Sequence, residues 1–180
     1  MKRTCLFGLA ALVLPGALAA QQPTAPSANP TTEAARRVGS HVAGYLMSAA
    51  DQVPAEKLSY KPTEAQMTFR DIWAHLAEAN YTICAGIGGM EAPALPERDG
   101  TESKDTLVAA LKASFDFCDQ ALAGTDDSKL GEEVSLGFMN GSRALAMFIY
   151  IDDLADHYSQ VANYMRLNGM LPPSARQGEN

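Results

Sequence analysis

The sequence predicts an all-α protein, a four-helix bundle. Four segments repeat apolar residues at three- and four-residue intervals, which is the spacing that puts side chains on one face of a helix. These segments are bounded by capping residues, glycines or prolines, and no segment has the alternation of a convincing strand. Each helix must bury its apolar face, and four such helices do so by packing together.

The beginning and the end of the chain have a different character from the rest. Residues 1–20 combine a basic start, a short apolar run and small residues, which is the layout of a cleavable secretory signal; an uncleaved membrane anchor is the alternative. Residues 21–32 are rich in Pro, Ser, Thr and Gln and predict a disordered linker, and 177–180 predict a disordered tail. We therefore expect one domain over 33–176, in a periplasmic or secreted protein whose mature chain has no membrane span.

The charge and the motifs of the chain exclude several classes of function. The net charge of −7 becomes more negative when Lys2 and Arg3 leave with the signal, whereas a nucleic-acid-binding protein needs a basic face. The chain has no Gly-rich phosphate loop, no G-x-S-x-G turn and no His-Glu-x-x-His. We expect no nucleic acid as a partner, and an unknown small molecule as the ligand. A bundle of this kind also allows a homodimer.

The first two helices are expected on either side of a turn-rich link. The first runs over roughly 32–52 and ends before Pro54. The second begins at Thr68, where Asp71 three residues later completes a capping box, and two glycines after Ile87 end it. The apolar stripe of the first helix is predicted to contain Val38, Val42, Tyr45, Leu46 and Ala49.

The last two helices flank a segment without a clear pattern. The third begins near Ser103 and ends at Gly124. Residues 125–141 have no strong period, and we expect them to be irregular. Ser142 can cap the fourth helix, which continues to Asn168, where a glycine and a double proline follow and prevent its continuation.

Two cysteines remain after the signal is removed, Cys84 and Cys118. An even pair in an exported chain predicts a disulfide, with two buried thiols as the alternative. Counted from the predicted caps, they lie sixteen and fifteen positions into their helices, so they meet only if these helices run in the same direction. The residues between Gly88 and Ser103 are long enough to return over the length of a helix. The predicted order is up, down, down, up, with a long crossover between the second and third helices.

Four ordered blocks cover most of 33–176: SAADQVPAEKLSYKP from Ser48, TFRDIWAHLAEANYTIC from Thr68, SFDFCDQAL from Ser114, and DHYSQVANYMRLNGMLPPSAR from Asp156. Together they resemble the DinB-like family, the YfiT-type metalloenzymes, and in particular its exported members. The resemblance implies a four-helix bundle with parallel second and third helices. It also implies an enzyme of the hydrolase or transferase type.

The resemblance further implies a divalent metal site, which better-known members build from one His of the second helix and a His-x-x-x-His pair of the fourth. Carried over by position, the ligands are His75 and His157, while Asp153 stands where the family has a histidine. This set would suit Zn, Mn, Fe or Ni, and the carboxylate shifts the preference toward harder ions. Asp153 and His157 are about one helical turn apart, a spacing that suits two ligands and equally an ordinary surface ion pair.

Two functions remain open at this point. The first is an exported metal-dependent enzyme, with Glu78, Tyr150 or Tyr164 close to the ion. Some relatives use small cytoplasmic thiols, which an exported protein would seldom meet. The second is a non-catalytic envelope protein that keeps the bundle without an ion and binds a small apolar ligand or a partner, to which methionines adapt. His41 of the first helix either approaches the same site or stays at the helix surface.

Overall fold

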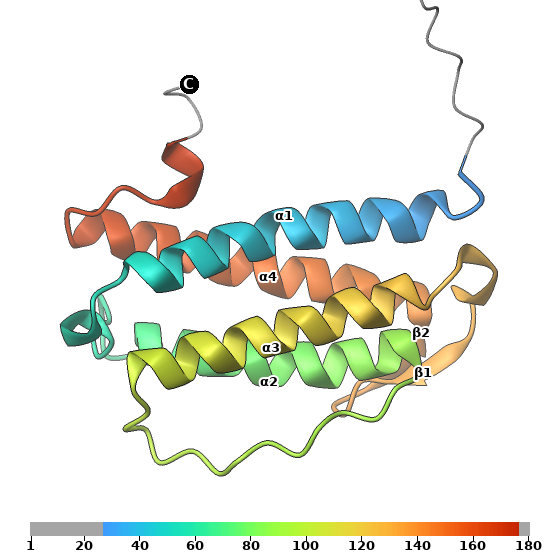
Figure 1. The fold of residues 1–180 in the computed structure, drawn as a ribbon, viewed down its shortest axis with the longest axis horizontal. Coiled ribbons are helices and arrows are strands. Elements are labelled where there is room, and N and C mark those ends of the chain that lie inside the picture. Colours follow the sequence, from blue (N-terminus) through green and yellow to red (C-terminus); the bar gives the residue numbers. More distant parts are fainter. Residues whose placement is uncertain (1–26, 177–180) are drawn as a thin grey trace, which may run out of the picture.

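A computed structural model describes residues 27–176 of the protein (Figure 1). It is a bundle of four long helices, which confirms the predicted all-α class. The predicted signal 1–20, most of the predicted linker and the tail 177–180 lie outside the described residues. The elements, in chain order, are α1 Pro30–Gln52, a 3₁₀ turn Ala55–Lys57, α2 Phe69–Gly88, α3 Lys104–Ala123, a 3₁₀ turn Asp127–Lys129, β1 Glu133–Ser135, β2 Asn140–Ser142, α4 Arg143–Leu167 and a 3₁₀ turn Pro173–Ala175.

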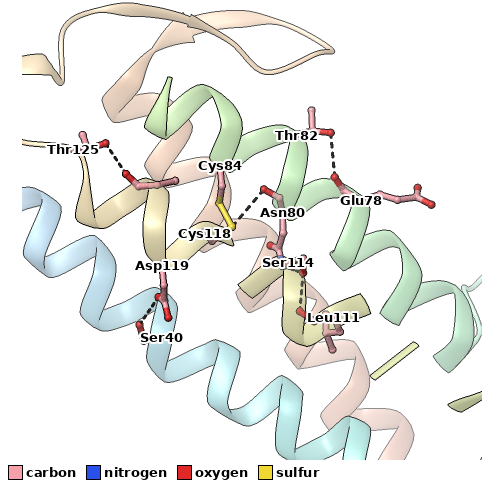
Figure 2. The surroundings of a disulfide bond; sticks show 11 residues. Ser40, Glu78, Asn80, Thr82, Cys84, Leu111, Ser114, Cys118, Asp119 and Thr125 are labelled. Atoms are coloured by element: carbon pink, nitrogen blue, oxygen red, sulfur yellow. Dashed lines mark hydrogen bonds between the residues drawn. A yellow bond between two sulfur atoms is a disulfide. The ribbon is translucent and has the colours of Figure 1, made fainter. Parts of the chain in front are cut away.

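Helices α2 and α3 run in the same direction, and α1 and α4 run opposite to them, as the cysteine positions predicted (Figure 1). The sulfur atoms of Cys84 and Cys118 form a disulfide that joins the parallel pair, with Cα atoms 5.1 Å apart (Figure 2). Both residues are fully buried. The chain between α2 and α3 returns along the outside of the bundle (Figure 1). None of the helices within 27–176 combines the length and the apolarity needed to cross a bilayer.

Local capping fixes where three of the helices begin. The Thr68 hydroxyl accepts a hydrogen bond from the backbone N–H of Asp71, whose carboxylate accepts one from the Thr68 N–H. Ser103 and Ser142 cap α3 and α4 in the same way, with side chains that accept from the N–H three residues on. Gly89 ends α2 in the left-handed conformation, with φ of 62°. These starts and this end confirm the predicted positions.

Helix α1 begins at Pro30, two residues earlier than predicted and inside the segment expected to be disordered. The reason is a contact with Asp127, which lies far from α1 in the sequence. The Asp127 carboxylate accepts hydrogen bonds of 2.9 Å from the backbone N–H groups of Thr31 and Thr32, and one of 2.7 Å from the Thr32 hydroxyl. The first N–H groups of a helix have no partner within it, so this carboxylate stabilises the first turn.

The buried face of α1 is made largely of small residues, and Val38, which we predicted to be part of it, is 44% exposed. At Gly39 the absence of a side chain makes room for the ring of Tyr150 on α4. A Cβ at Gly39 would lie 2.7 Å from the Tyr150 Cε1 atom, closer than any ordinary contact. Tyr150 is itself almost fully buried. Helices α1 and α4 are therefore held at a short distance by this pair.

The segment 125–141, predicted to be irregular, contains part of a small antiparallel hairpin that the sequence did not indicate. Strands β1 and β2 pair Glu133 with Ser142, and Ser135 with Asn140. Each strand has only three residues, which is too short to display an apolar alternation. The hairpin lies at the end of the bundle where α2 ends and α4 begins (Figure 1).

The hairpin is seated on α2 through a buried leucine and two glycines. Leu136 is fully buried. A Cβ at Gly86 of α2 would lie 2.6 Å from the Ser135 carbonyl oxygen, and a Cβ at Gly137 would lie 2.9 Å from the Thr82 methyl group. Gly137 also has a φ of 80°, which favours glycine. Both glycines are needed for the backbone of the hairpin to contact α2 this closely.

An arginine at the start of α4 binds carbonyl groups at the end of α2. Arg143 is buried, and its guanidinium donates to the carbonyl oxygens of Gly86, at 3.1 Å, and Ile87. It also pairs with the Glu132 carboxylate at 2.8 Å. Carbonyl groups in the last turn of a helix have no partner within the helix, so this cation stabilises the end of α2.

Candidate metal centre

Three polar side chains converge between α2 and α4. His75 projects from α2, and Asp153 and His157 project from α4, one turn apart. The Asp153 Oδ1 atom lies 3.4 Å from His75 Nε2 and 3.6 Å from His157 Nε2. One nitrogen or oxygen of each residue lies within 4.8 Å of the other two, and within 27–176 this is the only group of its kind that could hold a metal ion.

The position of these residues follows from the burial pattern of the two helices. Leu76 and Leu154, the neighbours in sequence of His75 and Asp153, are fully buried in the core. His75 and Asp153 are half-buried, so they lie at the rim of the packed interface, with one side toward solvent. His157 lies deeper and is only 7% exposed. The group is therefore fixed on its core side and open on the other.

Two atoms of the group are buried and have no hydrogen-bond partner: Asp153 Oδ2 and His157 Nε2. An unpaired buried polar atom costs about 1–3 kcal/mol, so a native structure seldom keeps two together without a reason. The interpretation as a simple ion pair leaves both atoms unpaired. A cation would bind both, and the residues present therefore fit a divalent metal ion.

The pKa values of the two imidazoles are shifted in opposite directions. Burial lowers the pKa of His157, opposed by the Asp153 carboxylate and reinforced by His75. The hydrogen bond to Asp153 raises the pKa of His75, and burial opposes it. His157 thus favours the neutral form, which is the form that binds metals. At His75 the same carboxylate that raises the pKa of the ring would also attract a metal cation.

The second ring nitrogen of His157, Nδ1, also has polar neighbours. Its Nδ1 atom lies 3.3 Å from the amide group of Gln160 and 3.7 Å from the Asp156 carboxylate. A histidine that binds a metal through Nε2 carries its proton on Nδ1 and needs an acceptor there. The Asp156 carboxylate is the acceptor on this side, at 3.7 Å, whereas the nearby atom of Gln160 is its amide nitrogen, a donor that bonds to the same carboxylate.

An open cleft of about 390 Å³ adjoins the group. His75 and Asp153 line it, together with Glu78 and Thr82 of α2. Its remaining wall is apolar and includes residues of α2, α4 and the hairpin: Ala79, Ile83, Phe138 and Ile149. A small molecule in the cleft can therefore contact His75 and Asp153, two of the three residues that would hold a metal ion.

Of the three expected neighbours of the site, Glu78 lines this cleft. The other two make contacts elsewhere: Tyr150 packs on Gly39 of α1, and the Tyr164 ring packs edge-on against Phe69. His41 is exposed, and its ring contacts Tyr45 on its own helix, as expected of a surface histidine.

Residues 40–161 match the sequence profile of the DinB superfamily. The fold is similar to a crystal structure of a DinB-like protein from Bacillus cereus, with TM-score 0.64, 17% identity, and coverage of 78% of this chain and 95% of that one. It is also similar to a DinB-like protein from Bacillus subtilis, with TM-score 0.60, 16% identity, and coverage of 76% and 95%. No curated protein matches the chain.

Proposed function

Because the chain belongs to the DinB superfamily, we propose that it is an exported, divalent-metal-dependent enzyme of the hydrolase or transferase type that acts on a small molecule. The observation that supports this most directly is the pair of unpartnered buried atoms, Asp153 Oδ2 and His157 Nε2, beside His75. A divalent cation held by the three residues would give both atoms a partner.

In this proposal His75, Asp153 and His157 hold the ion. Two imidazoles and one carboxylate suit Zn, Mn, Fe or Ni, and the carboxylate favours the harder of these ions. When bound, the ion would polarise a carbonyl group or lower the pKa of a water molecule. Three protein ligands, two of which line the cleft, leave room on the cleft side for a substrate group.

Other residues of the chain would handle protons and orientation. Glu78 lies three residues after His75 on α2 and is exposed in the cleft, where a carboxylate can take up or release a proton. Arg98 of the crossover lies 3.8 Å from this carboxylate and forms an ion pair with it. Asp156 and Gln160 keep the Nδ1 side of His157 in place.

The proposal of export rests on residues 1–20 and on the disulfide. Oxidising compartments such as the periplasm preserve disulfides, whereas the cytosol keeps thiols reduced. The Cys84–Cys118 bond is compatible with the periplasmic or secreted location that the secretory-signal pattern of 1–20 predicts.

Metal content tests the proposal. The purified chain, supplied with a mixture of Zn, Mn, Fe and Ni ions and then desalted, should retain about one ion per molecule by elemental analysis. His75→Ala and His157→Ala should each abolish retention, and His41→Ala, at an exposed histidine, should not. Retention that is absent in the wild type, or that survives both site variants, would contradict the proposal and favour a non-catalytic binding protein with the same bundle.

A further inference from the structure

Phe138 is a large aromatic residue that the fold leaves exposed to solvent. It lies in the turn between β1 and β2 and is 67% exposed, more than any other large apolar residue within 27–176. Exposure of this kind is ordinary on a loose loop. Phe138, however, directly follows the two residues that seat the hairpin on α2, which are the buried Leu136 and Gly137, the latter in close contact with Thr82.

The turn that carries Phe138 is also closed by its own backbone. The Leu136 N–H donates to the Met139 carbonyl oxygen at 2.8 Å, so the four residues of the turn are held between the paired strands. The backbone that carries Phe138 is therefore held in place, and the Phe138 side chain lines the cleft.

At that edge Phe138 completes an apolar wall, which we define as Ala79, Ile83, Phe138 and Ile149. His75, Asp153 and Glu78 line the same cleft and supply polar groups beside this wall. A cleft of about 390 Å³ with a largely apolar lining and a few polar groups has the size and the composition of a small-molecule site.

We propose that this cleft binds a small molecule with a compact, uncharged aromatic or branched apolar body and a polar head, and that Phe138 is its specificity-determining residue. The body packs on the apolar wall, and the head points toward the three polar side chains. The carboxylates of Asp153 and Glu78 disfavour an anionic body. The binding of the polar head rests on the proposed metal-dependent function, whereas the packing of the apolar body on the wall does not.

The first test uses two probes with the same metal-binding head, benzohydroxamate and acetohydroxamate, on the zinc-loaded chain. Stacking on Phe138 should make the aryl compound bind about tenfold more tightly. Phe138→Ala should remove this preference and leave acetohydroxamate unchanged. Met139→Ala, at the next exposed residue of the turn and outside the cleft, should keep the preference. Equal binding of the two probes to the wild type, or a preference that persists in Phe138→Ala, would overturn the inference.

The second test needs no metal and separates this inference from the proposed function. Benzyl alcohol is titrated into the chain in the presence of a chelator, and the methyl signals of Ile83 and Ile149 are followed by NMR. We expect saturable shifts at both methyl groups in the wild type and in Met139→Ala, and none in Phe138→Ala. If the chain binds no zinc but gives these shifts, the enzyme proposal fails and the apolar wall stands. If zinc binds but no shift occurs, the wall is refuted and the metal centre stands.

Discussion

The imidazole rings of His75 and His157 stand almost perpendicular, at 87°, with centroids 4.6 Å apart. They come from α2 and α4, so their approach is produced by the packing of two helices that the sequence separates widely. Asp153 lies within 3.6 Å of both rings and completes the group. Packing of the bundle thus brings together ligand types that a divalent ion prefers.

Replacing Asp153 by histidine should change which ion the site prefers. Three imidazoles are a softer set than two imidazoles and a carboxylate, so the affinity for zinc relative to manganese should rise by about tenfold or more in Asp153→His. Competition between the two ions, followed by elemental analysis, measures the ratio. Asp152→His, at the exposed neighbouring position, is the matched control. An unchanged ratio in Asp153→His would show that this carboxylate is not a ligand.

Two glycines of α1 should respond in opposite ways to the same substitution. Gly39→Ala forces a methyl group against the buried Tyr150 ring and should lower the free energy of unfolding by about 1–3 kcal/mol. Gly44→Ala meets nothing within 4 Å and should raise it by up to about 1 kcal/mol, because alanine favours a helix. Urea denaturation of both variants measures the difference. Changes of the same sign would contradict the close contact of α1 with α4.

Removing the disulfide should cost stability without changing the fold. The double variant Cys84→Ala, Cys118→Ala loses the restriction that the bond places on the unfolded chain, worth about 3 to 4 kcal/mol. For a chain of this length the Tm should fall by roughly 10 °C. Thermal denaturation followed by circular dichroism measures it. The wild type kept below its Tm with reductant is the control and should retain its bond; an unchanged Tm in the variant would contradict the prediction.

The first turn of α1 should loosen in acid. Burial raises the pKa of Asp127, but the hydrogen bonds from Thr31 and Thr32 outweigh it and lower the pKa to about 2. The unfolded value is about 3.9. A carboxyl with a lowered folded pKa contributes stability that is complete above the unfolded value and is lost as the pH falls toward the folded one. The window is therefore roughly pH 4 to pH 2.

This pH dependence can be assigned by comparing the wild type with Asp127→Asn. The wild type should be the more stable at pH 5, and the difference between the two should shrink as the pH falls from about 4 to about 2. Urea denaturation at several pH values measures the difference. Asp152→Asn, at an exposed position, should show no such convergence with the wild type. A difference that stays constant with pH would exclude Asp127 as the source.

The parts of the fold that could be predicted depend on neighbours in the sequence. Thr68, Ser103 and Ser142 cap their helices through bonds to residues three positions on, so the sequence alone contains the signal. The direction of α3 relative to α2 was accessible because Cys84 and Cys118 report a distance between two helices.

The parts that could not be predicted depend on contacts between distant segments. Asp127 accepts hydrogen bonds from the first turn of α1, and Arg143 donates to the last turn of α2. Each residue lies far in the sequence from the helix that it stabilises. The candidate site shows the same division. A resemblance to a known family pointed to His75 and His157, whereas no local pattern marked Phe138, whose position follows only from the seating of the hairpin on α2.

The complete burial of Cys84 and Cys118 constrains when their bond can form. Once α2 and α3 have packed together, neither thiol can meet an oxidant or an oxidoreductase, so a chain that folds while reduced traps its own sulfhydryls. Oxidation has to occur while the polypeptide is still open. The proposed export would supply that interval, because a chain that crosses a membrane unfolded could meet an oxidising catalyst before its helices pack.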